Sequence, residues 1–299
     1  MASTPMYAQE CELPIAVAFK TTAQPVSNST QRAIGNKLRQ LLSANGISGT
    51  VEFHSFALVP EFEVMGKSVT PGPPKQIVYQ LMLTLKVLNI EDGIVFSSYS
   101  TDMEGVGTSE GAAFSDAVKR LSPKNQEMQH FIYEAQDRII DYYNKNLDTT
   151  LAKAKMLTQT RQYDEALYLL MKVPECTNGY ETVLHMMEDV WQARIDLIGM
   201  KLLTKAQAIW GARTDSEAAV EAANLLAQID PESSSYEAAG ELMREIMAKA
   251  EKNTPWNFAM KVYEDNISLE KQRIKAARQV ATAFANNQKE SSQTFTFVK

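Results

Sequence analysis

QIVYQLMLTLKVLNIEDGIVFSSYSTDMEGVGTSEGAAFSDAVKRL, residues 76–121, is the stretch that decides the fold. From residue 79 to residue 87 the odd positions are all apolar and most positions between them are polar, which is the period-2 pattern of a strand with one buried face. Asp92 and Gly93 then favour a tight turn, and residues 94–99 return as the partner strand. We therefore predict a β-hairpin whose first strand lies in the core.

Two glycines follow the second strand, in the run Gly105-Val106-Gly107-Thr108-Ser109. We interpret them as a sharp backbone corner, with the Thr-Ser pair capping a helix that runs to about Leu121. A glycine corner before a helix also suggests a phosphate-binding loop. However, the Gly-x4-Gly-Lys-Ser/Thr spacing is absent, because no lysine follows Gly111 until Lys119. We therefore expect a structural corner and no nucleotide site.

Upstream of the hairpin, the sequence predicts a strand, a helix and a second strand. Residues 13–19 form a short apolar run, and a helical apolar stripe follows from Ile34 to Leu42. Residues 50–58 alternate well enough for the second strand. Residues 59–74 contain four prolines and two glycines, so we predict a long connecting loop there.

From residue 125 the apolar spacing becomes helical and contains an internal duplication. The residues Ala166, Leu169, Pro174 and Glu175 recur, 57 positions later, as Ala223, Leu226, Pro231 and Glu232. Each copy predicts a helix, a Pro-Glu turn and a second helix. The first copy resembles the second helix of a tetratricopeptide repeat, whereas the second copy lacks the aromatic-Asp-Glu start. A packed helical bundle is favoured over a peptide-binding groove.

Composition argues against several functional classes. The net charge of -6 gives no basic surface for sequence-specific nucleic-acid binding, and no segment has the apolar length of a membrane span. No close group of His, Cys, Ser and carboxylates suggests a nucleophile with its base, and no histidine pair has zinc-site spacing. Cys11 and Cys176 lie outside any Cys-x-x-Cys pair, so we expect reduced thiols. We expect no catalytic residue, no metal and no cofactor.

The C-terminal part supplies the candidate interaction residues. After Pro255 a long amphipathic helix is predicted, and a polar tether of residues 286–293 leads to a strand over residues 294–298. Such a tail can add itself to another sheet edge, so we expect it to leave its own domain and pair with a neighbouring subunit. The candidate contact residues are the aromatic side chains Trp256, Tyr263, Phe295 and Phe297.

The order of elements over residues 13–145 resembles a family that includes the curli secretion channel, the lipoprotein activators of penicillin-binding proteins and a flagellar ring component. This resemblance implies an α/β domain that works by self-assembly or docking, without catalysis, and that often builds rings. The residues that carry it are Ile15–Phe19, the strand 79–87, Asp92-Gly93, Ser97-Ser98, the run 105–109, Ala112 and Ala117.

We therefore predict an α+β protein with a mixed, sandwich-like α/β domain over residues 13–123. A helical, tetratricopeptide-like region follows over residues 124–286, and an extended tail over 287–299. The expected function is that of a non-enzymatic ring or adaptor that contacts itself, as a cyclic homo-oligomer, and neighbouring assembly proteins.

The cellular setting is predicted from the start of the sequence together with the resemblance. Residues 1–12 lack a secretory pattern and a signal for a lipidated cysteine. We expect a virion component assembled in the bacterial cytoplasm, similar to a neck or tail ring protein of a crAss-like or other podovirus-type phage. The alternatives are a cell-envelope assembly factor of the curli-channel and lipoprotein-activator type, and a protein that remains cytoplasmic.

Overall fold

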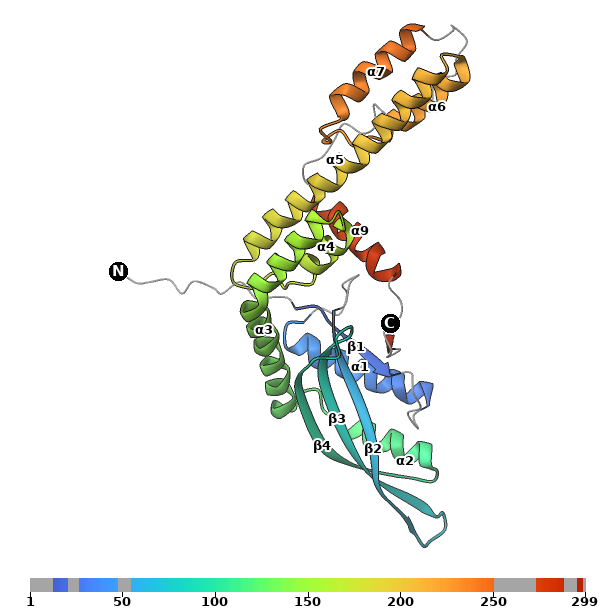
Figure 1. Ribbon diagram of the computed structural model, residues 1–299. Helices are drawn as coiled ribbons and strands as arrows, with labels where there is room; N and C mark the ends of the chain where they lie inside the picture. Colours follow the sequence, from blue (N-terminus) through green and yellow to red (C-terminus); the bar gives the residue numbers. More distant parts are fainter. Residues whose placement is uncertain (1–12, 21–26, 48–54, 250–272, 288–294, 298–299) are drawn as a thin grey trace, which may run out of the picture. The chain divides into compact units, whose positions relative to one another are not determined.

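The computed structural model describes residues 13–20, 27–47, 55–249, 273–287 and 295–297 (Figure 1). The chain divides into two compact units. The first comprises Met1–Asn146, Pro174–Asn178 and Gln288–Lys299, and the second comprises Leu147–Val173 and Gly179–Asn287. The domain boundaries predicted at residues 124 and 287 stay predictions.

The first unit is built on a five-stranded sheet with the strand order β4-β3-β2-β1-β5. β1 is parallel to β2, and every other neighbouring pair is antiparallel. This mixed sheet, together with a helical second unit, confirms the predicted α+β class. The strands are β1 (Ile15–Lys20), β2 (Phe56–Thr70), β3 (Gln76–Asn89), β4 (Val95–Gly107) and β5 (Phe295–Phe297).

The predicted hairpin is confirmed as β3 and β4. Leu81, Leu83 and Leu85 of β3 are at most 1% exposed, so this strand has the buried face that its alternation predicts. In the turn, the Asn89 side-chain oxygen accepts a hydrogen bond from the Glu91 backbone N–H at 2.9 Å, and Gly93 has a φ of 68°. A positive φ at this position is what glycine allows at no steric cost.

The predicted loop over residues 59–74 is wrong, because β2 continues to Thr70. The parallel ladder of β1 with β2 ends at Val17 and Leu58. Pro60 follows the end of this ladder, where its missing N–H removes no ladder hydrogen bond. Gly66 follows a register shift, where a β-bulge inserts one residue into the strand.

Helices α1 (Asn28–Ala44), α2 (Glu110–Arg120) and the start of α3 (Gln126–Gln159) belong to the first unit. Aromatic contacts place α2 and α3 on one face of the sheet. Ring centroids are 5.1 Å apart for the pair Phe62 and Phe114, and 6.0 Å apart for the pair Phe56 and Tyr143. α1 packs against β1 and α2. One face of the sheet is therefore covered by helices, and its other face carries Glu61 and Thr84.

The corner predicted at Gly105 and Gly107 is wrong, because both residues lie in β4 and neither has a positive φ. They allow close packing of α2 instead. A Cβ atom added at Gly105 would lie 1.9 Å from the backbone oxygen of Ala113, and one added at Gly107 would lie 2.4 Å from the Ala113 nitrogen. The helix cap was predicted correctly, since the Ser109 hydroxyl accepts a hydrogen bond from the Ala112 N–H.

The second unit is helical. α4 packs against α5 and α9, and the rings of Tyr168 and Phe284 lie 5.6 Å apart. α6 and α7 pack against α5, with Trp210 and the alanines of α6 in a shared buried cluster. Besides the later part of α3, the helices are α4 (Tyr163–Met171), α5 (Tyr180–Ala212), α6 (Ser216–Leu226), α7 (Tyr236–Lys249) and α9 (Arg273–Asn287).

The predicted duplication of helix, turn and helix is confirmed. In both copies, a backbone N–H of the turn donates a hydrogen bond to a side chain of the preceding long helix. The Asn178 N–H donates to the side-chain oxygen of Asn144 in α3, and the Ser234 N–H donates to the Asp196 carboxylate in α5, both at 2.7 Å. In each copy the preceding long helix therefore fixes the turn through one side chain. The likeness to tetratricopeptide repeats stays a prediction.

Cys176 is disulfide-bonded, so the expectation of a reduced thiol is wrong for this residue. The sequence contains one other cysteine, Cys11, which lies outside the described residues. The prediction failed because it relied on the absence of a Cys-x-x-Cys pair. Such a spacing rule detects only cysteines that are close in sequence, whereas a disulfide can join residues that folding brings together.

Candidate functional site

The predicted tail strand is confirmed as β5, but it pairs within its own chain. Its residues Phe295, Thr296 and Phe297 lie opposite Lys20, Phe19 and Ala18 of β1. The expectation that the tail leaves its own domain is therefore corrected by the structure. The outer edge of β1 offers main-chain hydrogen-bonding groups, which the tail satisfies.

Phe295 covers a small apolar cluster on the face of the sheet that carries Glu61. It is partly buried and packs against Ala18, Ala57, Val59 and Leu88, none of which is more than 4% exposed. This candidate contact residue is thus engaged inside the first unit. For Phe297 the structure describes the backbone pairing alone, and Trp256 and Tyr263 lie outside the described residues.

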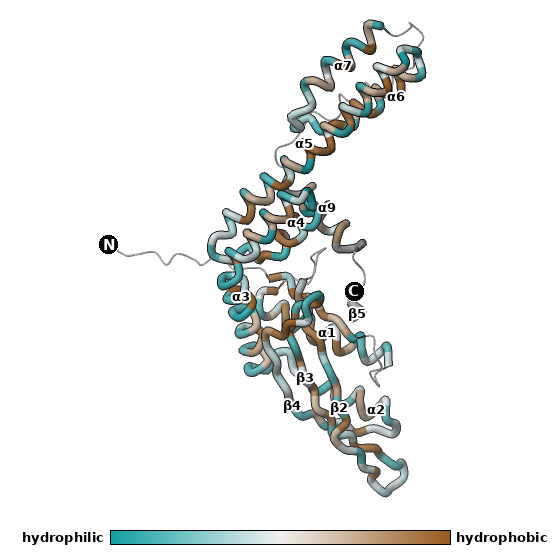
Figure 2. Tube along the Cα trace, in the orientation of Figure 1, coloured by the Kyte–Doolittle hydropathy of each residue, from teal (hydrophilic) through white to brown (hydrophobic). Residues whose placement is uncertain are grey.

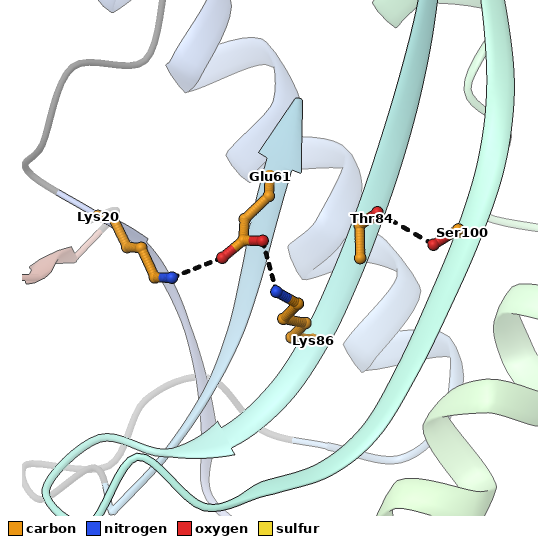
Figure 3. Close-up of polar contacts among 5 residues, drawn as sticks. All are labelled: Lys20, Glu61, Thr84, Lys86 and Ser100. Atoms are coloured by element: carbon orange, nitrogen blue, oxygen red, sulfur yellow. Dashed lines mark hydrogen bonds and ion pairs between the residues drawn. The ribbon is translucent and has the colours of Figure 1, made fainter. Parts of the chain in front are cut away.

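Beside this cluster, one carboxylate joins three strands (Figure 3). Glu61 of β2 lies between Lys20 of β1 and Lys86 of β3, and each lysine Nζ is 2.6 Å from a Glu61 oxygen. Since the pairing of β1 with β2 ends at Leu58, the bond from Lys20 extends the contact between these strands beyond their ladder. On the same face, the hydroxyls of Thr84 and Ser100 lie 3.0 Å apart and link β3 to β4.

The two lysines also set the titration of Glu61. Partial burial raises the pKa of its carboxyl, but the hydrogen bonds and charges of Lys20 and Lys86 outweigh this effect, so the pKa lies below its ordinary value of 4.5. A carboxyl with a lowered pKa stabilises the folded state above the ordinary value. That contribution is lost as the pH falls through the lowered pKa.

We expect Glu61→Gln to lower the free energy of unfolding by about 1 kcal/mol at pH 7, because partly exposed ion pairs contribute modestly. This difference from the parent should shrink as the pH falls below 4.5 and through the lowered pKa, because the parent carboxyl then becomes protonated. Urea unfolding between pH 3 and pH 7 measures both. Glu63→Gln, at an exposed position on the same strand, is the matched control. An equal loss at all pH values in Glu61→Gln would contradict the account.

The hairpin of β2 and β3 continues beyond α2, and we call residues 63–80 the hairpin arm (Figure 1). The base of the arm is tied to the start of α2. Lys67 forms an ion pair with Glu110, and Tyr79 also forms a hydrogen bond with that carboxylate. These bonds, Lys67 first, hold the pKa of Glu110 below its ordinary value. The arm is therefore anchored on one side by a helix of its own unit.

The arm exposes apolar side chains. The exposed fractions are 46% for Val64, 60% for Met65 and 53% for Val69. Apolar stretches run along β2 and β3 (Figure 2). Apolar groups next to the main chain of an edge strand suit docking of another protein surface.

Within the described residues, the structure contains neither a candidate metal site nor a candidate membrane-spanning helix. Among them, no three His, Cys, Asp or Glu side chains gather closely enough to bind a metal ion. No helix in the same ranges has the length and apolar content to cross a lipid bilayer.

Comparison with known proteins adds little. No family model matches the sequence, and no curated protein matches it. One solved structure, a "putative lipoprotein" from Caulobacter crescentus CB15, is similar over 41% of this chain and 88% of its own, with 10% identity and a TM-score of 0.25. A similarity this low transfers neither a fold nor a function.

Sequence reasoning missed the arm and the ion pairs of Glu61. All the exposed apolar residues of the arm fall inside the stretch that was predicted to be a loop. The sequence there contained a usable signal, because Phe62, Val64 and Val69 are apolar residues of high strand propensity next to charged or polar residues. No sequence spacing pointed to the meeting of Lys20, Glu61 and Lys86.

Proposed function

We propose that this protein is a non-enzymatic assembly component whose first unit docks onto further copies of the same chain through the hairpin arm. The observation that carries the proposal is the exposure of Val64, Met65 and Val69 on the part of β2 that runs beyond its ladder with β1. Fully burying an exposed apolar side chain contributes about 1.5 to 3 kcal/mol, and these side chains, which are about half exposed, would contribute part of that in an interface.

Our finer proposal is a cyclic ring or adaptor within a virion, of the kind found in the neck or tail of a crAss-like or other podovirus-type phage. Support comes from the resemblance over residues 13–145 to a family that often builds rings. A closed ring requires two different surfaces on each copy, one that meets the preceding copy and one that meets the next. The arm supplies one of them in this proposal.

The second candidate is a cell-envelope assembly factor, and the disulfide at Cys176 favours it. Disulfides persist in oxidising compartments, such as the bacterial periplasm, and are rare in the reducing cytosol. Both candidates share the same chemistry, which is docking between protein surfaces. They differ in the location of the assembly, which is the virion for the first candidate and the cell envelope for the second.

The arm is tested by the double variant Met65→Asp/Val69→Asp. Two charges in an apolar contact should weaken self-association at least tenfold, which corresponds to about 1.4 kcal/mol. Because both side chains are exposed, the free energy of unfolding should change by no more than about 0.5 kcal/mol per site. Sedimentation velocity over a concentration series measures the association.

The matched control is Tyr133→Asp, which places a charge at a residue that is 60% exposed on α3 of the same unit. This control should associate like the parent. The proposal fails if the double variant associates like the parent, or if the control weakens association by the same factor.

A further inference from the structure

We infer that Glu110 is a positioning residue for the hairpin arm, because it binds one side chain from each strand of the arm and holds both at the start of α2. The inference deepens the proposed function by naming the contact that fixes the docking surface. Its docking role rests on that proposed function, whereas the hold on the arm does not and can be measured in a monomer.

The β-bulge in β2 determines which side chains of the arm face α2. Before the bulge, the ring of Phe62 contacts an aromatic ring of α2. Side chains of a strand alternate between the two faces of the sheet, so Val64 lies on the same side. The register shift between Val64 and Gly66 inserts one residue, and the α2 side then continues with Lys67 and Val69. Without the inserted residue, Lys67 would point to the opposite face.

Glu110 lies in the first turn of α2 and binds both strands of the arm. Its carboxylate forms an ion pair with Lys67 of β2 and accepts a hydrogen bond from the hydroxyl of Tyr79 on β3. Lys67 and Tyr79 lie directly opposite each other in the β2–β3 ladder. The Lys67 Nζ is also 6.0 Å from the centroid of the Tyr79 ring, at the limit of a cation–π contact. One carboxylate therefore ties a cross-strand pair to a helix.

This anchor lies among the exposed apolar side chains of the arm. Val64 is 46% exposed and Val69 is 53% exposed, and both lie on the same side of β2 as Lys67. A movement of the arm away from α2 therefore displaces both valines. A surface that is already held in its bound conformation loses less freedom on binding, so an anchored arm docks more tightly than a free one.

The anchor is built from partly exposed groups, so its effect is local. The exposed fractions of the side chains are 43% for Lys67 and 59% for Glu110. Ion pairs of this kind contribute modestly and are screened by salt. The buried leucines of β3, at positions 81, 83 and 85, do not depend on it. Loss of Glu110 should therefore change the arm and leave the rest of the first unit folded.

The test is hydrogen exchange in the full-length parent and in Glu110→Gln. Amides between residues 67 and 79 should exchange at least about twofold faster in the variant, because opening the arm no longer breaks the ion pair. Amides of residues 81–87 and the urea midpoint should not change. Raising the salt from about 0.01 M to about 1 M shortens the Debye length from about 30 Å to about 3 Å, so the difference between the two chains should shrink.

Two further variants separate the anchor from a general effect of charge. Glu104→Gln removes an exposed carboxylate from β4, opposite Gln80, and should exchange like the parent in the arm. The double variant Lys67→Glu/Glu110→Lys restores a pair of opposite charges. Its arm should exchange more slowly than that of either single variant, because the two positions are coupled.

The positioning role is overturned if the arm of Glu110→Gln exchanges like that of the parent, or if Glu104→Gln accelerates it by the same factor. Sedimentation then tests the docking role, since Glu110→Gln should weaken self-association by about the factor by which exchange in the arm rises. Equal association of the two chains would remove the anchor from docking. A parent that stays monomeric removes the assembly proposal and leaves the hold of Glu110 on the arm, which exchange measures in the monomer.

Discussion

Gly105→Val is expected to unfold the first unit, with a loss of more than about 4 kcal/mol in the free energy of unfolding. A Cβ atom at this position would lie 1.9 Å from the backbone oxygen of Ala113 and 2.6 Å from the backbone nitrogen of Ala117. Both are backbone atoms of α2, so relief of the clash requires the whole helix to move away from β4. Urea unfolding followed by circular dichroism and by tyrosine fluorescence measures the loss.

Gly111→Ala is the matched control for this prediction. Gly111 lies in α2 itself, and a Cβ atom added there would meet nothing within 4 Å. Because alanine favours a helix over glycine, we expect a gain of about 0.5 to 1 kcal/mol. If Gly105→Val unfolds at the urea concentration of the parent, the close packing of α2 on β4 is wrong.

Leu83→Asp is the second substitution for which we expect loss of the fold. Leu83 is 0% exposed in the middle of β3, opposite Phe62 on β2 and Thr101 on β4. An unpaired carboxylate there would lie among apolar side chains without a hydrogen-bond partner. Burial of an unpaired charge is among the single substitutions that lower the free energy of unfolding most, by more than about 4 kcal/mol. The measurement is the yield of folded protein and its melting curve.

Thr84→Asp places the same charge one residue further along the same strand, on the opposite face. Thr84 is partly exposed and loses only its bond to Ser100, so this variant should fold with a loss of about 1 kcal/mol or less. A Leu83→Asp chain that melts like Thr84→Asp would show that β3 is not a core strand.

The elements that sequence reasoning predicted are those fixed by local chemistry. Alternation between residues 79 and 87 determines which face of β3 is buried, Gly93 supplies the positive φ of the turn, and Ser109 caps α2. Each of these signals lies within a few residues of the structure that it specifies. The duplicated helix pairs belong to the same class, because their periodicity is local as well.

The elements that were missed depend on neighbours distant in sequence. Pro60 is compatible with β2 because the parallel ladder with β1 ends at Leu58, and the extent of that ladder depends on a strand far away in the sequence. Gly105 allows α2 to pack closely on β4. In the sequence, the same glycine suggests a turn, because the helix that packs on it cannot be read from its neighbours. The partner of the tail strand was predicted in another subunit because nothing near Phe295 in the sequence indicates β1.

The candidate site was predicted least well. Of its four predicted residues, the structure describes the packing of Phe295 alone, and the apolar patch of the arm was assigned to a loop. Surface patches of this kind carry no spacing rule, since their residues are selected by a partner surface and not by the fold of the chain itself.

The mass of the purified full-length chain in solution tests the central claim most directly. Sedimentation from about 1 µM to about 1 mM covers association free energies of about 8 to 4 kcal/mol. The account predicts a discrete species at a whole-number multiple of 33.4 kDa that forms as the concentration rises. A single species of 33.4 kDa at every concentration would contradict it.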